Sequence, residues 1–372
     1  MARRGSVRSK CYPQPWPQHG GEGDALLARL GISDNDALTD LSASLNPLGP
    51  PDWLGDWLAR SLPLLTHYPD RQQQEAREAL AHHHALDAAQ VRVTNGGAEA
   101  IHLIAQAYRS KRALVIEPTF GEYARACELN GMEVRRLSLV GDDFRLDVDG
   151  LCQALVAVDV VFLCRPNNPT GTLVSCQAIE TLLEHAEAAN TLLVVDEAFI
   201  EFHGEQASLV DWVRRGAPLV LLRSLTKFYC LPGLRLGYLL AQPERVQQIS
   251  GYQVAWSLNA LAAALIPHLL NDQGYVERTL NWVSGERSRV GKNLRRLGYV
   301  VPEAHANFVL CRPGGVASPA RGEAMLRQLV KHGFIARHTH TFAGLDGSWV
   351  RLALGLPATN DAWLAALAGA AE

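Results

Sequence analysis

The chain has 372 residues, of which 48% are hydrophobic and 20% are charged, and its formal net charge at pH 7 is −3. At roughly 100–200 residues per domain, this length predicts two domains. A nucleic-acid-binding protein would carry a strongly basic surface, and a membrane-spanning helix would need an apolar run of about 20 residues. The sequence has neither pattern, so no nucleic-acid or membrane partner is expected.

The N-terminal end is basic, with Arg3, Arg4, Arg8 and Lys10, but no apolar core follows these residues. This pattern is typical of a solvated tail rather than of a signal peptide. The chain contains 7 cysteines, with neither disulfide-framework nor metal-binding spacing. Such usage favours reduced thiols and a cytoplasmic protein.

Two histidine-rich stretches, 82–84 and 338–340, raise the question of a metal site. Neither has an obvious carboxylate or thiolate complement, which a metal site would need. We therefore expect surface histidines and no metal.

Most of the chain alternates between strand-like and helical patterns. Such alternation implies crossover helices and a mostly parallel sheet. A helical stretch at 177–189 is a clear example of the helical pattern. The apolar, strand-like runs lie at 113–117, 160–164, 191–196, 218–223 and 235–241.

The pattern changes near residue 245, where a long helical region begins and continues to about residue 297. Strand-like runs at 307–311 and 349–354 follow, with helical patterns at 322–332 and 361–371. This arrangement predicts a smaller α+β domain at the C-terminal end. The first 46 residues are punctuated by proline and glycine and are expected to wrap around a site as an arm.

The first segment that carries chemistry is 94–101, Thr-Asn-Gly-Gly-Ala-Glu-Ala-Ile, which follows the strand-like 91–93 and opens a helical stretch. Small residues before a helix start leave backbone N–H groups free to hold a phosphate, here at Gly97 and Ala98. The segment lacks the Gly-x-Gly-x-x-Gly pattern, so a dinucleotide site is not favoured.

Two further segments follow predicted strands and end in polar side chains. In Arg165-Pro-Asn-Asn-Pro-Thr-Gly171, Asn168 can offer an amide hydrogen to a phenolate oxygen. The run 191–196 delivers Asp196 to a strand end, where its carboxylate can pair with a protonated pyridine nitrogen. Glu197, the next residue, is the rival candidate for this pairing.

The fourth segment, 224–235, places Lys227 between two apolar runs, three residues after Ser224 and eight before Arg235. A lysine in a dry loop between buried strands loses its proton more readily, and a neutral, positioned amine forms Schiff bases. The hydroxyl of Ser224 and the guanidinium of Arg235 suit a phosphate group.

In this order, the four segments resemble those of the fold-type I pyridoxal-phosphate (PLP) enzymes, the aspartate aminotransferase superfamily. The resemblance implies an α/β fold, with a large domain of mostly parallel sheet flanked by helices and a smaller α+β C-terminal domain. The expected boundaries are 1–46 for an arm that contributes to the active site and the small domain, 47–260 for the PLP-binding domain, and 261–372 for the small domain.

The resemblance implies pyridoxal 5′-phosphate as the cofactor, with Lys227, Asp196 and Asn168 as the catalytic residues. Phe120 would stack on the pyridine ring, and Tyr68 would reach the cofactor phosphate of a neighbouring subunit, so a homodimer is expected. Many members have Tyr where this chain has Phe199, so one hydrogen bond to the 3′-oxygen should be missing. The implied cofactor-binding residues are Gly97, Ala98, Phe120, Asn168, Asp196, Ser224, Lys227, Arg235 and Tyr68.

Within the superfamily, the chain most resembles the L-threonine-O-3-phosphate decarboxylases of cobalamin biosynthesis. The resemblance lies in His19-Gly-Gly21 and in the segments 41–49, 223–229, 256–262 and 343–346. It implies conversion of a phosphorylated amino acid, L-threonine O-3-phosphate, to (R)-1-aminopropan-2-ol O-2-phosphate and CO2. The alternative is a histidinol-phosphate-type aminotransferase.

The resemblance assigns substrate binding to residues from several parts of the chain. It leaves open which arginine holds the carboxylate and which the phosphate. These residues are His19, Gly20, Ser44, Asn168, Arg337 and Arg351. Ser44 stands where the decarboxylase pattern has Asn, so threonine phosphate and serine phosphate both remain candidate substrates. A third reading, the effector-binding half of a transcription regulator, is disfavoured because only about 40 residues precede the first core segment and they lack a helix-turn-helix pattern.

Overall fold

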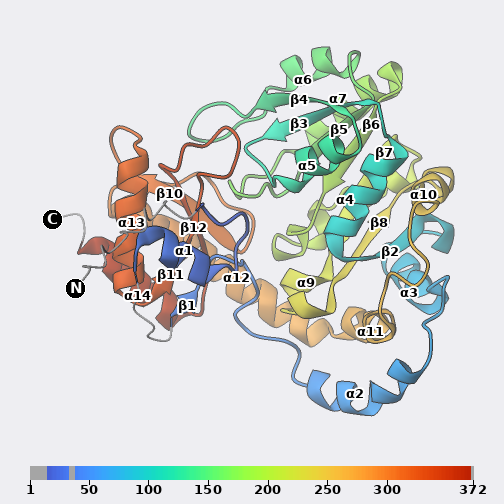
Figure 1. Ribbon diagram of the computed structural model, residues 1–372, viewed down its shortest axis with the longest axis horizontal. Coiled ribbons are helices and arrows are strands. Elements are labelled where there is room, and N and C mark those ends of the chain that lie inside the picture. Colours follow the sequence, from blue (N-terminus) through green and yellow to red (C-terminus); the bar gives the residue numbers. More distant parts are fainter. Residues whose placement is uncertain (1–14, 33–37, 370–372) are drawn as a thin grey trace, which may run out of the picture.

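The computed structural model describes residues 15–32 and 38–369, and a seven-stranded sheet forms the centre of its larger part (Figure 1). The strand order is β2-β8-β7-β6-β5-β3-β4. Strands β4, β3, β5, β6 and β7 run parallel, whereas β8 is antiparallel to both β7 and β2. The strands are β2 (Val91–Asn95), β3 (Arg112–Glu117), β4 (Glu133–Ser138), β5 (Val160–Cys164), β6 (Leu192–Asp196), β7 (Leu219–Ser224) and β8 (Leu236–Leu240).

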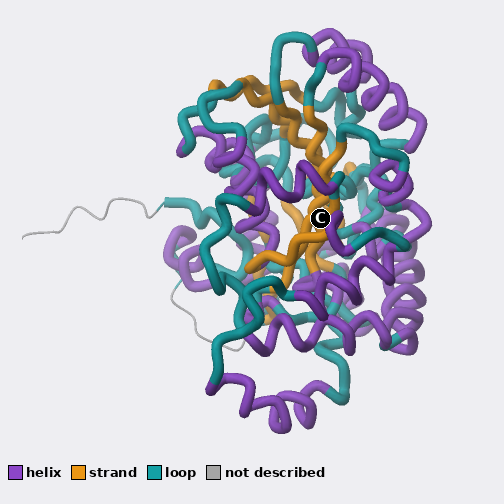
Figure 2. Tube along the Cα trace, turned by 90° about the vertical axis from the view of Figure 1, so that its right-hand side faces the viewer, coloured by secondary structure: helices purple, strands orange, loops and turns teal. Residues whose placement is uncertain are grey.

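Helices cover both faces of this sheet, as Figure 2 shows from the side. Along β3, Leu114 and Ile116 belong to one buried cluster and Ala113 and Val115 to another, because successive side chains of a strand point to opposite faces. One face is packed by α3 (Gln74–His84), α6 (Val148–Leu155), α7 (Cys176–Ala189) and α11 (Ala260–Asn271). The other is packed by α4 (Gly96–Ala107), α5 (Glu122–Leu129) and α10 (Pro243–Ser250).

A smaller, four-stranded antiparallel sheet follows in the C-terminal part, in the order β12-β13-β10-β9. The N-terminal arm joins this part through β1 (Thr39–Asp40), which pairs in parallel with β11 (Phe334–Ile335). The remaining elements are β9 (Tyr299–Val300), β10 (Phe308–Pro313), β12 (Arg337–His338), β13 (Val350–Ala353), α1 (Gly23–Leu30), α2 (Leu54–Ser61), α8 (Val210–Arg214), α9 (Leu225–Phe228), α12 (Gln273–Arg296), α13 (Pro319–Lys331) and α14 (Pro357–Ala368). Short 3-10 helices occupy Leu62–Thr66, Ala88–Gln90, Ile200–Phe202, Glu205–Ala207 and Pro232–Leu234.

The expected fold class is confirmed, and the long helical region expected from about 245 to 297 is helical but interrupted. The structure has three helices there, α10, α11 and α12, separated by a loop over 251–259 and a break at residue 272. Each new helix begins at a capping side chain: Asn259 accepts a hydrogen bond from Ala262 N at 2.8 Å, and Asp272 accepts one from Tyr275 N at 2.9 Å. The domain boundaries remain a prediction.

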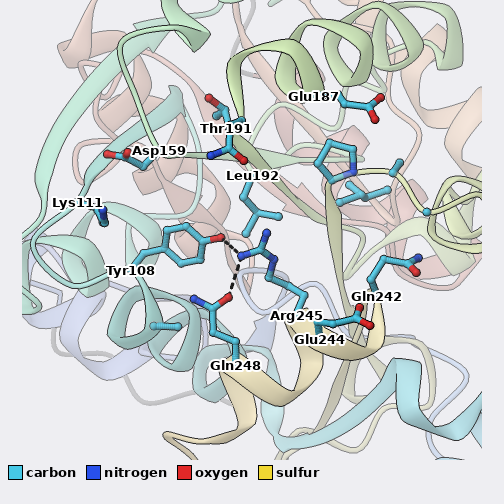
Figure 3. A pocket seen from close by; sticks show the side chains of 16 residues that line it. Tyr108, Lys111, Asp159, Glu187, Thr191, Leu192, Gln242, Glu244, Arg245 and Gln248 are labelled. Atoms are coloured by element: carbon cyan, nitrogen blue, oxygen red, sulfur yellow. Dashed lines mark hydrogen bonds between the residues drawn. The ribbon is translucent and has the colours of Figure 1, made fainter.

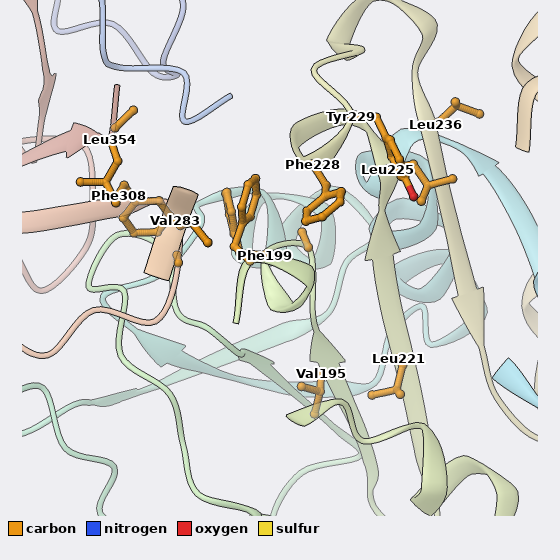
Figure 4. Close-up of a cluster of buried hydrophobic side chains, with 14 of the residues drawn as sticks. Val195, Phe199, Leu221, Leu225, Phe228, Tyr229, Leu236, Val283, Phe308 and Leu354 are labelled. Carbon is orange, nitrogen blue, oxygen red and sulfur yellow. The ribbon is translucent and has the colours of Figure 1, made fainter. Parts of the chain in front are cut away.

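Aromatic rings join the large sheet to the small one (Figure 4). Phe199, just after β6, meets Phe308 of β10 edge to face, with ring centroids 5.1 Å apart. Phe228 of α9 lies 5.1 Å from Phe202 in the same cluster. Such pairs add to the burial of apolar area and hold the two sheets in one arrangement. Within the described residues, no helix is both long and apolar enough to span a bilayer.

The expectation that the histidine stretches lie on the surface is wrong for His84 and His338. His84 is buried, and its Nε2 shares a hydrogen bond of 2.9 Å with the hydroxyl of Tyr238. His338 is also buried, and its Nε2 donates to Pro17 O at 2.8 Å. The potential ligand atoms of His83, His84 and Glu205 lie within 4.8 Å of one another. Glu205 already pairs with the Arg223 guanidinium, whose positive charge opposes a metal ion there.

His84 should make stability depend on pH. Burial lowers the pKa of His84 from 6.5 to about 2. Below about pH 6.5 the unfolded chain therefore takes up a proton that the folded chain does not, and stability falls with pH by up to ~1.4 kcal/mol per unit. Urea unfolding at several pH values between about 7.5 and 5 should show wild type losing stability relative to His84→Gln.

The matched control is His185→Gln, which alters an exposed imidazole on α7. This variant should follow wild type across the pH range. A His84→Gln protein that kept the full wild-type slope would assign the pH dependence to other groups.

Candidate active site

Lys227 lies in α9, directly after β7, at the edge where the parallel strands end. Its Nζ donates to Ser224 Oγ at 3.2 Å and lies 5.4 Å from the centre of the Phe199 ring. Burial lowers the pKa of the Lys227 amine, and the charge of Asp196 partly opposes this shift. The amine is thus held in one place and gives up its proton more readily than a free lysine.

Asp196 ends β6, beside the strand that leads to Lys227. Its Oδ2 accepts a hydrogen bond from the Tyr123 hydroxyl at 2.6 Å, and its Oδ1 accepts one from Ala198 N at 2.9 Å. Burial raises the pKa of Asp196, whereas the Tyr123 hydrogen bond and the charge of Lys227 lower it. Tyr123 was not predicted, although its place one helical turn after Phe120 was a usable signal.

Glu197, the rival of Asp196, belongs to a different set of contacts. It is fully buried and lies 3.5 Å from Arg165 and 3.6 Å from Arg223. It also accepts hydrogen bonds from Ser208 Oγ at 2.6 Å and Leu209 N at 2.9 Å. These partners use both of its oxygens, so Asp196 is the carboxylate available beside Lys227.

Asn168 lies in the loop after β5, and its Oδ1 accepts a hydrogen bond from the Arg351 guanidinium. Its amide N–H groups therefore remain as donors. The preceding Asn167 is buried, donates to Pro118 O at 2.9 Å and accepts from Thr119 Oγ1 at 3.1 Å. These two bonds tie the loop that carries Asn168 to the loop that carries Phe120.

The N-terminus of α4, with Gly97 and Ala98, has no side-chain cap, so its first N–H groups can hold an anion. The Arg235 guanidinium packs against Gly96, where an added Cβ would lie 2.6 Å from its Nη2. Ser224, which bonds Lys227, also shares a hydrogen bond of 2.8 Å with Thr226. The helix terminus, the guanidinium and the hydroxyls fit the phosphate of PLP. The lysine beside them fits its carbonyl carbon.

Arg337 and Arg351 stand directly opposite each other on the antiparallel strands β12 and β13. Both are buried. Burial and the charge of Arg337 lower the pKa of Arg351 to about 9, and burial lowers that of Arg337 to about 10. The side chain of Arg351 bonds to Asn168 Oδ1 and, at 2.5 Å, to Ser42 O, while its buried Nε has no partner. Two neighbouring guanidinium groups held by neutral oxygens form a site for anions.

The N-terminal arm packs against these arginines. Arg337 donates to Pro17 O at 3.0 Å and Gln18 O at 2.6 Å. A Cβ on Gly20 would lie 2.1 Å from Ser42 O, so only glycine permits this approach. The arm thereby brings His19 within 3.6 Å of Glu122 and sets its ring 5.9 Å from that of Phe120.

The segment 42–46 connects Arg351 to Lys227. Ser44 is buried in a left-handed conformation with φ 52°, its carbonyl accepts from Asn307 Nδ2 at 2.9 Å, and its Oγ has no partner. Asn46 N donates to Lys227 O at 3.1 Å, and Asn46 Nδ2 donates to Phe228 O at 2.8 Å. The structural roles of Asn46 and Asn307 were not predicted.

Tyr68 does not join these residues within its own chain. Its side chain is 82% exposed, and its ring lies 4.9 Å from that of Trp256. An exposed ring in this position is available for contact with another copy of the chain.

A large cavity lies elsewhere, at the opposite ends of the strands (Figure 3). It has a volume of about 580 Å³, and Leu192 at the start of β6 and Leu219 at the start of β7 line it. Arg245 reaches into it and donates to Tyr108 Oη at 2.5 Å and Gln248 Oε1 at 2.8 Å. This cavity is separate from Lys227 and from the predicted site.

Comparison with known proteins agrees with this geometry. The family model for aminotransferase class I and II matches residues 38–368. The chain is 34% identical over 352 residues to the threonine-phosphate decarboxylase of Salmonella typhimurium, covering 94% of this chain and 95% of that protein.

Two solved structures share the fold. The L-threonine-O-3-phosphate decarboxylase from Porphyromonas gingivalis has a TM-score of 0.77 and 28% identity and covers 89% of this chain and 97% of that chain. The histidinol-phosphate aminotransferase from Clostridium acetobutylicum has a TM-score of 0.83 and 30% identity and covers 89% of this chain and 98% of that chain. The chain therefore belongs to the aminotransferase class I and II family, with a fold-type I fold and pyridoxal 5′-phosphate as its cofactor.

Proposed function

We propose that the protein decarboxylates L-threonine O-3-phosphate to (R)-1-aminopropan-2-ol O-2-phosphate and CO2, supplying the aminopropanol linker of cobalamin in the cytoplasm. One observation carries the proposal: two buried guanidinium groups, Arg337 and Arg351, stand opposite each other without a carboxylate partner among the described residues. A substrate with both a carboxylate and a phosphate monoester would place two anions beside these two cations. The Salmonella relative, named a threonine-phosphate decarboxylase, supports the same reaction.

Different residues of the chain contribute different contacts to this substrate. The terminal nitrogens of both arginines bond to oxygen atoms: those of Arg351 to Asn168 Oδ1 and Ser42 O, and those of Arg337 to Pro17 O, Gln18 O and Thr341 Oγ1. The buried Nε of Arg351 has no partner. Arg337 therefore adds positive charge and fixes the arm, and the arm carries His19 and Gly20 to the substrate. The unpartnered Oγ of Ser44 lies in the segment between Arg351 and Lys227 and is available to the substrate as well.

PLP, when bound, supplies an electron-accepting ring for the electron pair left by the broken Cα–carboxylate bond. Lys227 would hold the cofactor, the N-terminus of α4 with Arg235 would hold its phosphate, and Asp196 would pair with its ring nitrogen. Asn168 would donate to its 3′-oxygen. After CO2 leaves, the protonated Lys227 Nζ would deliver a proton to Cα, and the lowered pKa of this group makes it a stronger acid than a free lysine.

The first test is the reaction itself. The PLP-loaded protein should release CO2 from L-threonine O-3-phosphate at the same rate with and without 2-oxoglutarate, because decarboxylation needs no amino-group acceptor. Measurement of CO2 and glutamate separates the two candidate reactions. Glutamate formation from histidinol phosphate and 2-oxoglutarate, with no CO2 from threonine phosphate, would establish the aminotransferase instead.

Tyr123→Phe tests the pairing role of Asp196. The hydroxyl of Tyr123 lowers the pKa of Asp196, so its loss should raise that pKa and weaken the attraction for a ring cation. We expect the dissociation constant for PLP, measured by absorbance titration, to rise roughly tenfold or more. The deficit should grow as pH falls, because Asp196 is then protonated more often.

Tyr108→Phe is the matched control, since Tyr108 lies in the separate cavity of Figure 3. It should bind PLP as wild type does. A Tyr123→Phe deficit that did not vary with pH would reject the electrostatic explanation.

We further propose that the active protein is a homodimer. Large apolar side chains are exposed in two segments that meet at the rings of Tyr68 and Trp256, which lie tilted against each other. The exposed apolar residues of these segments are Leu62, Leu64, Leu65, Tyr68, Tyr252, Val254 and Trp256. Such a patch is typical of a protein interface, and burying it would bring Tyr68 to the partner's cofactor phosphate.

Mixing two inactive variants tests whether Tyr68 of one subunit completes the site of the other subunit. Tyr68→Ala and Lys227→Ala homodimers should each show little activity, whereas a mixed dimer contains one site with both native residues. Activity should therefore reappear when the two proteins are unfolded, mixed and refolded together. No recovery, despite mixed dimers detected by mass spectrometry, would place Tyr68 in its own subunit's site or outside the site.

A further inference from the structure

A second cavity of about 580 Å³ is lined by three arginines. Arg71 lies in the loop before α3, Arg77 lies in α3, and Arg92 lies in β2. The other wall comes from α10 and the loop that follows it. Its lining includes Glu244, Gln253, Val254 and Ala255.

These arginines are held by neutral groups rather than by carboxylates. Arg77 donates to Val91 O at 3.0 Å and Ala88 O at 2.5 Å. Arg92 donates through Nε to Gln253 Oε1. Burial and the charge of Arg77 lower the pKa of Arg92, so the two guanidinium groups repel each other.

Two carboxylates outside the cavity lining, Asp70 and Glu99, attract Arg92 by their charge, and both also accept hydrogen bonds from other groups. Asp70 accepts from the backbone N–H groups of Gln72 at 2.9 Å and Gln74 at 2.7 Å. Glu99 accepts from Asn95 N at 2.6 Å and Gln253 Nε2 at 3.0 Å. The one carboxylate that lines the cavity is the exposed Glu244. Three arginines therefore face one lining carboxylate.

The cavity of Figure 3 has a similar volume but a different balance of charge. Its walls carry Asp159, Glu187 and Glu244 together with Lys111 and Arg245, so its cations already meet anions. In the cavity of the three arginines, by contrast, Asp70 and Glu99 attract Arg92 only from outside the lining, and the guanidinium groups that line the cavity favour a bound anion.

We propose that the cavity lined by Arg71, Arg77 and Arg92 binds a tetrahedral oxyanion, either inorganic phosphate or the phosphate group of a monoester. This site is separate from the phosphate position beside Lys227, because Arg92 lies toward the start of β2, whereas the uncapped N-terminus of α4 follows its end. Arg71 and Arg92 donate to the anion, and Arg77 adds charge while its donors hold the main chain.

Binding there would also fix two neighbouring segments. The loop with Arg71 and Gln72 follows Tyr68, and the wall residues Val254 and Ala255 precede Trp256, whose ring centre lies 4.9 Å from that of Tyr68. The anion would thus order the surface that we assign to the subunit interface.

The test measures phosphate binding to the holoenzyme at constant ionic strength, by calorimetry and by thermal unfolding. The double variant Arg71→Gln/Arg92→Gln should bind inorganic phosphate at this site on the order of tenfold more weakly or worse. In phosphate-free buffer it should unfold at the same or a higher temperature than wild type, because a like-charge repulsion has been removed. Arg296→Gln, an exposed arginine on α12, is the matched control and should retain the wild-type response.

Arg351→Gln separates this site from the active site. It should remove the active-site share of phosphate binding and leave the second site intact. Titration with glycerol phosphate distinguishes the two sources of the anion: stronger binding than inorganic phosphate assigns a monoester, and weaker binding assigns the free ion. If Arg351→Gln abolishes all phosphate binding, or if the double variant responds as wild type does, the cavity does not bind an oxyanion.

Discussion

Buried positive charge without matching negative charge is the constraint on which the site depends. Arg337 and Arg351 are buried, Lys227 is half-buried, and Asp196 is the carboxylate beside the lysine. A buried charge is tolerated only when hydrogen bonds satisfy it, and here carbonyl, amide and hydroxyl oxygens do so. These neutral oxygens hold the guanidinium groups in place without neutralising them. The fold therefore keeps an attraction for anions that only ligands can satisfy.

A few residues away in the same sheet, a buried arginine is instead paired with carboxylates. Arg223, in the strand that leads to Lys227, meets Glu201 at 2.9 Å and also pairs with Glu205, while Glu197 lies 3.6 Å away. Burial raises the pKa of Glu201, and the charge of Arg223 opposes this shift. A paired arginine stabilises one arrangement of loops, whereas an unpaired one remains available for a ligand.

The sequence predicted the parts of the fold that arise from continuous local patterns. Strands β5, β6 and β7 were predicted because both of their faces are buried, which gives uninterrupted apolar runs. The edge strand β4 was missed because Glu133-Val-Arg-Arg-Leu-Ser138 is mostly exposed and polar. The loop at 251–259 was missed because capping by Asn259 was not recognised.

The residues of the candidate site likewise divide into those that local sequence patterns predicted and those that they did not. Asn168, Asp196 and Lys227 were predicted because side chains after the carboxyl ends of parallel strands gather at one edge of a sheet. Tyr123 and Asn307 were not predicted because their hydrogen bonds join residues 73 and 263 positions apart in the chain. Likewise, the sequence did not show that His84 and His338 are buried, because helix α3 and strand β12 acquire their covered faces only through packing against distant segments.

Asn46 links the N-terminal arm to the main chain at Lys227. Its backbone N–H bonds to Lys227 O, and its side chain bonds to Phe228 O, Tyr275 Oη and Thr279 Oγ1. One end of the segment 42–46 is thus fastened to the lysine helix and to α12, while the other end touches Arg351 through Ser42. If the arm moves away from Arg351, the segment 42–46 must also shift the main chain at Lys227. Movement of the arm that admits substrate is consequently coupled to the orientation of Lys227. The length of this five-residue span limits how far the site can open.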